Sequence, residues 1–356
     1  MQRFAVIMAG GTGERFWPLS RKSRPKHLWN ITGEKSCLLS QTFKRVSLLV
    51  PQKNIFIITN KEQIEGIKEF APEIPLKNII TEPCGRDTAA AIALAATIIK
   101  SKDENASFAV FPADHIICDK PAFSEIMLSA FEVAEGGDRL VTVGLVPTFP
   151  ATGYGYIKRG KKFETSLGEY YKASKFFEKP NLARATKYLK SGDFYWNAGI
   201  FVWKLSSILA AIKKNIPDTF KVFDKIYANL KKNSNPARAI GKQYEKLEKI
   251  SIDFAVMEKA KNVYVVPATF DWDDVGSWRA IERHCCADFN NIVEIGEVYS
   301  KDSKNCVVLD KSERATALVG VEDLIVIHAK DATLICKKDC SESLKDLVKT
   351  LPKNLK

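Results

Sequence analysis

The sequence predicts an α/β fold with a mostly parallel central sheet over residues 1–288, followed by a small β-rich domain over residues 289–356. Three observations predict this organisation. Short apolar runs alternate with helix-like stretches in the first half of the chain, and a glycine-rich turn directly follows the first run. From Ile292 onward, short apolar runs recur at roughly ten-residue spacing with turn residues between them, which is typical of a small all-β unit.

The first half of the chain supplies the strands and helices of the expected sheet. Its apolar runs are nearly continuous, as in strands buried on both faces, and the alternation with helices favours parallel pairing. The expected strands are residues 4–8, 55–58, 108–111 and 140–143. The expected helices between them are residues 38–48, 61–70, 88–100 and 122–135. Ligands in such folds bind beyond the carboxyl ends of the strands.

The second half is mixed and then β-rich. Further helices are expected at residues 182–190, 205–212, 220–230 and 254–259. In the β-rich domain, strands are expected at residues 306–309, 317–321, 324–328 and 333–336, with a closing helix over 342–350.

Composition limits the classes of protein. The 356 residues are 46% hydrophobic, which is ample for a sizeable core, and the net charge is +12. The basic residues are scattered, so an enzyme of phosphorylated substrates is favoured over a nucleic-acid-binding protein. The eight cysteines show no Cys-x-x-Cys spacing, and the longest apolar stretch, residues 89–99, is too short for a bilayer. We therefore expect a cytoplasmic protein with no zinc site, disulfide framework or membrane segment.

The strongest motif follows the first apolar run. It reads GGTGERFWPLSR over residues 10–21 and continues to Pro25-Lys26. Glycines after a strand let backbone N–H groups approach phosphate closely, and Arg15 and Lys26 add positive charge. Two other phosphate loops are excluded, because Glu14 stands where a Walker motif has lysine and Phe16 where a dinucleotide motif has glycine or alanine.

This motif resembles the signature of the sugar-phosphate nucleotidylyltransferases, and its form is similar to the mannose-1-phosphate guanylyltransferase branch. The resemblance extends from residue 5 into the β-rich domain. It implies a Rossmann-like nucleotidyltransferase domain, a left-handed β-helix-like C-terminal domain and a homodimer. It also implies that the chain joins GTP and mannose 1-phosphate to give GDP-mannose and diphosphate, with Mg²⁺. A C-terminal isomerase domain of longer relatives does not fit the remaining length, so isomerase activity is not expected.

The nucleotide site is expected in two segments. Asp87 or Thr88 can cap a helix whose small first residues leave room for a planar base. Guanine offers donors at N1 and the 2-amino group, so the Glu82 carboxylate or a local carbonyl is a plausible acceptor. The resemblance assigns nucleotide binding to Ala9, Gly10, Gly11, Thr12, Gly13, Glu82, Gly85, Arg86, Asp87 and Thr88.

Two aspartates are candidates for the metal. Asp114 follows an expected strand, and Asp274 lies in the cluster of residues 271–278. Magnesium prefers carboxylate oxygens and bridges substrate phosphates, so two aspartates suffice. The resemblance carries the metal role to Asp114 and Asp274, with Asp273 as the alternative to Asp274. His115 is expected to pack or to support the site rather than to bind the metal.

The sugar phosphate is expected at a third set of residues. Glycines near Tyr154 permit a close backbone approach, Glu178 and Lys179 suit a sugar hydroxyl and a phosphate, and Asn197 can bond hydroxyls. The resemblance groups them as the sugar-phosphate site, which comprises Gly153, Tyr154, Gly155, Glu178, Lys179 and Asn197.

The expected chemistry is in-line attack of the sugar phosphate on the α-phosphorus of GTP. The nucleophile is already an anion, so positioning and charge neutralisation supply most of the catalysis. We expect Arg15 and Lys26 to act on the GTP phosphates, Lys179 on the sugar phosphate, and Asp114 through the metal. Another base or another sugar phosphate, such as heptose or glucose 1-phosphate, stays open as an alternative. A non-catalytic nucleotide-binding subunit is disfavoured because Lys26, Asp114 and Asp274 are all present.

Overall fold

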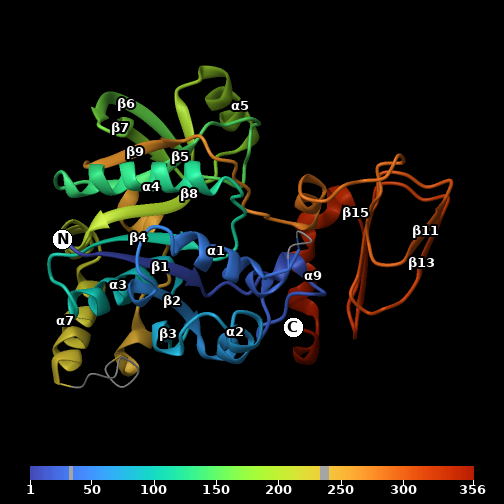
Figure 1. Ribbon diagram of the computed structural model, residues 1–356, viewed down its shortest axis with the longest axis horizontal. Coiled ribbons are helices and arrows are strands. Elements are labelled where there is room, and N and C mark those ends of the chain that lie inside the picture. The colour runs from blue at the N-terminus through green and yellow to red at the C-terminus, as the bar shows by residue number, and fades with distance from the viewer. Residues whose placement is uncertain (32–34, 233–239) are drawn as a thin grey trace.

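The computed structural model describes residues 1–31, 35–232 and 240–356 (Figure 1). Within these residues the large domain is built on one nine-stranded sheet, in the order β3-β2-β1-β4-β8-β5-β9-β7-β6. Its strands are β1 (Arg3–Ala9), β2 (Ile55–Asn60), β3 (Ile79–Glu82), β4 (Ser107–Pro112), β5 (Leu140–Leu145), β6 (Tyr156–Thr165), β7 (Gly168–Phe177), β8 (Phe194–Lys204) and β9 (Val263–Ala268).

The parallel core of this sheet is confirmed. Strand β1 pairs in parallel with β2 and β4, and β2 pairs in parallel with β3. The second half is mixed, because antiparallel β8 lies between β4 and β5, and β5 then pairs in parallel with β9. The short strand β3 was not among the expected strands, because only two of its four residues, Ile79 and Ile80, are apolar.

Helices cover both faces of the sheet, as expected. Alternate residues of β1 enter two different apolar cores: Ala5 and Ile7 pack with α1 and α4, while Phe4 and Val6 pack with α3, α6 and α7. Helix α3 is apolar on all sides because it is buried almost throughout. The helices are α1 (Leu38–Val46), α2 (Ile64–Phe70), α3 (Asp87–Lys100), α4 (Lys120–Glu135), α5 (Leu182–Ser191), α6 (Leu205–Asn215) and α7 (Pro217–Lys232).

Shorter helical turns complete the chain. The expected helix at residues 254–259 is wrong in type, because Asp253–Met257 forms a single π-helical turn, η7. The 3-10 turns are η1 (Glu14–Phe16), η2 (Lys26–Leu28), η3 (Gln52–Asn54), η4 (Lys61–Gln63), η5 (Leu76–Asn78), η6 (Lys242–Lys246), η8 (Trp278–Arg283), η9 (Lys338–Ser343) and η10 (Lys353–Leu355).

The C-terminal domain has the expected β-helix-like character. Strands β10, β12 and β14 pair in parallel and form one layer, in which β15 pairs with β14 in antiparallel orientation. Strand β11 pairs in parallel with β13 in a second layer. Successive coils of the chain therefore stack on one another, and helix α9 (Leu344–Thr350) follows. The strands are β10 (Val293–Ile295), β11 (Val298–Lys301), β12 (Val307–Asp310), β13 (Thr316–Val319), β14 (Leu324–His328) and β15 (Thr333–Lys337).

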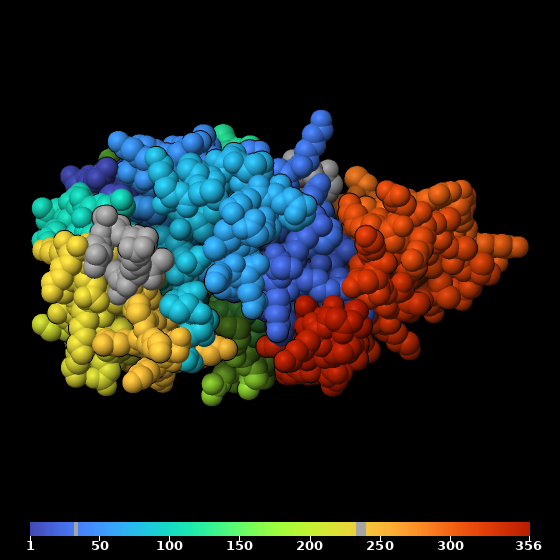
Figure 2. Space-filling view, turned by 90° about the horizontal axis from the view of Figure 1, so that it is seen from below, coloured from blue at the N-terminus to red at the C-terminus, as the bar shows by residue number. Residues whose placement is uncertain are grey.

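The C-terminal segment folds back onto the glycine-rich motif. Phe16 and Trp17 share one apolar cluster with Leu344 and Val348 of α9. The indole N–H of Trp17 donates to the carbonyl of Leu355 at 2.9 Å. Figure 2 shows the same arrangement on the surface, where the last residues, in red, lie against the N-terminal segment, in blue. The C-terminal residues thus pack directly against the motif.

Candidate active site

Two cavities meet at the carboxyl ends of β1 and β4. The larger, about 630 Å³, extends from the glycine-rich loop to the start of α3 and to η7. The smaller, about 380 Å³, lies between the same loop, Asp114 and the segment 274–276. They share Thr12, Gly13, Lys26 and Asp114, so they form one continuous site.

The backbone of the loop depends on glycine at position 13. Gly13 has a φ of +64°, and an added Cβ would lie 2.9 Å from the backbone nitrogen of Lys26. Gly10 and Gly11 line the larger cavity, and an added Cβ on Gly11 would meet nothing within 4 Å. The loop therefore presents bare backbone to the cavity.

The ammonium group of Lys26 joins three segments of the site. Its Nζ lies 2.7 Å from Oδ2 of Asp114 and donates to the carbonyls of Asp274, at 2.7 Å, and Val275, at 2.9 Å. The side chain is only 6% exposed. All three of its N–H donors are thus used within the protein, and Lys26 fixes the two metal candidates relative to each other.

Asp114 and Asp274 have the properties that a magnesium site needs. Burial alone would raise the pKa of Asp114, but Lys26 and the neighbouring histidines outweigh it and lower the pKa to about 2. Asp274 accepts a hydrogen bond from the hydroxyl of Tyr154 at 2.8 Å through Oδ1. Each carboxylate keeps one oxygen that accepts no hydrogen bond from the described residues, and both line the smaller cavity. Two carboxylates and water fit magnesium, and within residues 1–31, 35–232 and 240–356 no cluster of three or more metal-binding side chains occurs.

Asp273 has a different environment from Asp274. Its carboxylate accepts hydrogen bonds from Arg283, at 2.6 and 2.8 Å, and from the amide of Val275, at 2.8 Å. Nε2 of His284 lies 2.8 Å from it. These partners lower its pKa against the effect of burial. Asp273 is thereby occupied in bonds within the chain, and only Asp274 lines the cavity.

His115 lies at the edge of the smaller cavity. Its Nδ1 accepts a hydrogen bond from the indole of Trp272 at 3.1 Å, and the two rings pack edge to face. Burial lowers its pKa, so the neutral imidazole is favoured. The contact orients the segment that carries Asp273 and Asp274.

Glu82 lines the larger cavity. Burial raises its pKa to about 7, and the hydroxyl of Tyr244 donates a hydrogen bond to it. Gly85, Asp87 and Thr88 line the same cavity. A buried carboxylate beside glycine backbone is suited to a base that offers two donors.

The expected helix cap at Asp87 or Thr88 is wrong. The cap position is Arg86, and no side chain caps it. Asp87 has a φ of +66°, so its carboxylate accepts from the adjacent amide of Thr88, at 2.7 Å. The Thr88 hydroxyl accepts instead from the amide of Ile252, at 2.8 Å, while Arg86 donates to the carbonyl of Glu245 and does not line either cavity.

None of the expected sugar-phosphate residues lines either cavity, but Asn197 contacts Asp253 of the larger cavity and Tyr154 contacts Asp274 of the smaller one. An added Cβ on Gly155 would lie 2.6 Å from the carboxylate of Glu178, which Lys179 pairs with. Asn197 donates to Asp253 at 3.0 Å and accepts from Thr142 at 2.9 Å. Lys179 is 61% exposed, and Gly153 has open space around it.

Several residues of the site were not predicted from the sequence. Asp253 lines the larger cavity, and burial together with nearby Glu178 raises its pKa to about 7. Its only sequence signal was an acid next to an apolar run. Lys249 also lines that cavity, and Lys345, from the C-terminal domain, lines the smaller one.

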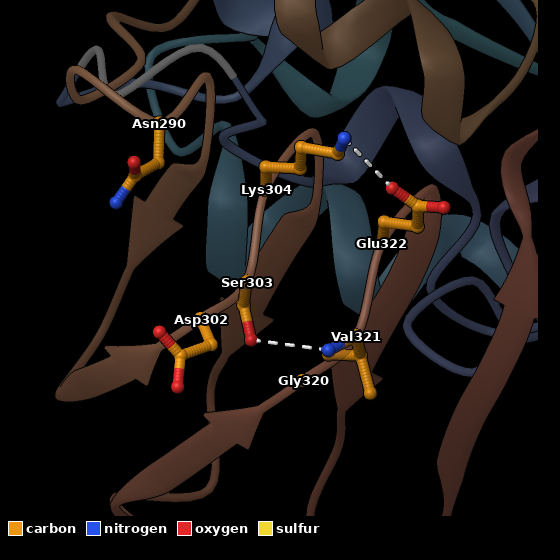
Figure 3. A pocket seen from close by; sticks show the side chains of 7 residues that line it. All are labelled: Asn290, Asp302, Ser303, Lys304, Gly320, Val321 and Glu322. Carbon is orange, nitrogen blue, oxygen red and sulfur yellow. Dashed lines mark hydrogen bonds and ion pairs between the residues drawn. The ribbon is translucent and has the colours of Figure 1, made fainter.

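A further hollow of about 550 Å³ lies in the C-terminal domain (Figure 3). Two pairs of its lining groups are bonded to each other: Lys304 pairs with Glu322 at 3.1 Å, and Ser303 accepts from the amide of Val321 at 3.2 Å. It contains none of the residues of the two cavities described above. Its lining residues are Asn290, Asp302, Ser303, Lys304, Gly320, Val321 and Glu322.

The class of protein that the fold and this site define is identified by similarity to known sequence families. The sequence profile of the family described as Nucleotidyl transferase matches residues 4–290, and that of the MannoseP isomerase/GMP-like beta-helix domain matches residues 296–351. The chain belongs to the nucleotidyl transferase family. Among its residues described in the structure, no helix has both the length and the apolar character that a membrane span requires.

Individual relatives cover almost the whole chain. It is 37% identical to the Mannose-1-phosphate guanylyltransferase 2 of Escherichia coli O157:H7, over 98% of this chain and 73% of that protein. It is 38% identical to the Mannose-1-phosphate guanylyltransferase of Salmonella montevideo, over 97% and 73%. A crystal structure from Thermus thermophilus, described as a mannose-1-phosphate geranyltransferase, superposes with a TM-score of 0.84 at 34% identity, over 98% of this chain and 99% of that one.

Proposed function

We propose that this enzyme is a mannose-1-phosphate guanylyltransferase, which forms GDP-mannose and diphosphate from GTP and mannose 1-phosphate. One observation carries the proposal: the glycine-rich loop, Asp114 and Asp274 line one cavity, which is continuous with a larger cavity lined by Glu82. The curated relatives named above bear this activity in their names and match 97–98% of the chain.

The proposed role of the larger cavity is to hold the nucleoside. The backbone amides of Gly10 to Gly13 would face the phosphates, and Glu82 would accept from N1 and the 2-amino group of guanine in its ionised form. The pKa of Glu82 is about 7, so both its protonated and its ionised form are populated near neutral pH. Hydrogen bonds donated by guanine would stabilise the ionised form.

The proposed role of the smaller cavity is charge neutralisation at the reacting phosphates. Asp114 and Asp274 would hold Mg²⁺, which when bound offsets the repulsion between the two anionic substrates. Lys26 keeps both aspartates in position, as its three short contacts indicate, and Arg15 faces the GTP phosphates. No general base is required, since the attacking phosphate oxygen is already ionised.

The proposed sugar-phosphate site lies beside Asp253. Asn197, Asp253 and Glu178 offer oxygens to sugar hydroxyls, and exposed Lys179 would bind the phosphate of mannose 1-phosphate. In this proposal the phosphate of mannose 1-phosphate attacks the α-phosphorus of GTP in line with the bond that breaks.

We also propose a cytoplasmic homodimer. The eight cysteines are free thiols, which suits a reducing compartment. The C-terminal domain exposes the apolar side chains of Tyr299, Val319 and Ile335, at 60%, 68% and 65%. Light scattering of the purified protein tests this proposal, and a monomeric mass across the micromolar range would refute it.

The activity is tested with GTP, mannose 1-phosphate and Mg²⁺. Diphosphate release is followed continuously, and GDP-mannose is identified by chromatography. Asp114→Asn serves as the inactive control, and chelation of Mg²⁺ should abolish turnover. Parallel assays with other nucleoside triphosphates and with glucose or heptose 1-phosphate decide the substrate; a faster reaction with any of them would overturn the proposal, as would GTP binding without turnover.

A further inference from the structure

We propose that the C-terminal domain completes the active site, with Lys345 of α9 binding the β- and γ-phosphates of the nucleotide. In the absence of nucleotide, Glu342 holds Arg15, and the phosphates then replace it as the partner of Arg15. The inference rests on the proposed function, because it assigns the phosphate contacts of that same site.

Lys345 is the cation of the smaller cavity that is free to meet a ligand. It lines this cavity together with Gly13, Arg15 and Asp114. Lys26, the other lysine there, has all three donors used within the chain. Lys345 forms no ion pair or hydrogen bond with any residue in the part of the chain that the structure describes; its charge only helps to lower the pKa of neighbouring Asp346, and its side chain is exposed. An ammonium group placed in this way gains most from an incoming phosphate.

Arg15 is held by a partner that is easily displaced. Its Nε lies 3.3 Å from the carboxylate of Glu342, and the two side chains are 46% and 66% exposed. Exposed ion pairs of this kind contribute little net stabilisation. Guanidinium–phosphate hydrogen bonds are stronger, so a triphosphate in the cavity can take Arg15 from Glu342. Glu342 then lies near the phosphates as an uncompensated negative charge that weakens binding.

The position of Lys345 is fixed by the packing of its helix. Leu344 and Val348 are buried one helical turn apart and contact the cluster that contains Phe16 and Trp17. Helix α9 packs directly against η1 of the glycine-rich motif. Lys345 therefore lies at the cavity on a helix that packs directly against the glycine-rich motif.

The two residues predict kinetic effects of opposite sign. Lys345→Met should raise KM for GTP, and KM for diphosphate in the reverse reaction, about tenfold, with kcat and KM for mannose 1-phosphate little changed. Glu342→Gln should lower KM for GTP about twofold to threefold. Lys345→Arg should restore most of the affinity, because it restores the charge.

Lys349→Met is the matched control. It removes the same charge from the same helix, but Lys349 pairs with Asp346 and does not line the smaller cavity. We expect its KM values to stay within twofold of wild type. Thermal unfolding of all variants checks that α9 stays packed, which is expected because Lys345 makes no bond to lose.

The outcomes separate the two proposals. A wild-type enzyme that makes no GDP-mannose overturns the proposed function. If the wild type is active, equal effects of Lys345→Met and Lys349→Met, or a change confined to mannose 1-phosphate, overturn the role of Lys345. An unchanged or raised KM for GTP in Glu342→Gln overturns the role of Glu342.

Discussion

Replacing Lys26 by methionine should weaken both the fold and the catalysis. The substitution keeps the apolar stem but removes the donors to the carbonyls of Asp274 and Val275 and to the carboxylate of Asp114. A buried acceptor left without its donor costs about 1–3 kcal/mol. The side chain of Asp114 is 36% exposed and can rehydrate, so its loss of a partner adds little. We therefore expect the free energy of unfolding to fall by about 2–4 kcal/mol.

The effect is measured by urea unfolding and by steady-state kinetics in conditions where the variant is folded. Because Lys26 positions both proposed metal ligands, kcat should fall by roughly a hundredfold, about 3 kcal/mol of transition-state stabilisation. Arg3→Met is the control: it removes a partly buried pair with Glu135, 2.7 Å long, at the opposite end of β1. That variant should lose stability but keep its kcat. Unfolding free energy within about 0.5 kcal/mol of wild type, or near-normal turnover, in Lys26→Met would refute the positioning role.

Three further predictions concern the carboxylates of the site. Asp274→Asn should raise the Mg²⁺ concentration for half-maximal activity at least about tenfold and leave the melting temperature unchanged. Asp273→Asn should instead lower the melting temperature and leave the Mg²⁺ titration unchanged. The reverse pattern would exchange the roles of the two aspartates. Because burial raises the pKa of Glu82 from 4.5 to about 7, its ionisation destabilises the fold, with no cost below pH 4.5 and the full cost above pH 7. Glu82→Gln should therefore raise the free energy of unfolding by up to about 3 kcal/mol at pH 8 and leave it unchanged at pH 4.5, and equal effects at both pH values would contradict the assignment. Asp253→Asn should raise KM for mannose 1-phosphate about fivefold to tenfold and leave KM for GTP unchanged. Initial rates measured with each substrate varied in turn test this prediction. A raised KM for GTP with an unchanged KM for mannose 1-phosphate would show that Asp253 serves the nucleotide instead.

The parallel part of the fold was predictable because burial leaves a strong local signal. Strands β1, β2 and β4 are buried on both faces, so each reads as a continuous apolar run. Strand β8 was missed because Asn197 and Gly199 interrupt the apolar run of its eleven residues. Its antiparallel place between β4 and β5 depends on partners 51 or more residues away in sequence, which no local pattern records.

The residues of the site were predictable where a motif fixes the backbone. Gly13 has to be glycine because of its positive φ and its contact with Lys26, so the loop is visible in the sequence. Asp253 was not visible, because its importance comes from Asn197 and from the cavity beside it. Carboxylates placed by tertiary contacts leave only a weak pattern of their own.

The choice between Asp273 and Asp274 shows why adjacent candidates need coordinates. Asp273 pairs with Ile116 in an isolated antiparallel bridge, so the chain there is extended and successive side chains point to opposite sides. One of the two aspartates must then face the cavity while the other faces away. The sequence alone does not show which of them faces the cavity, because its composition and spacing are the same in both cases. The amide of Asp273 donates to the carbonyl of Ile116 at 3.1 Å, and that pairing determines which side each aspartate faces. It directs Asp273 toward Arg283 and His284 and leaves Asp274 beside Asp114, two residues before Ile116 on the partner segment.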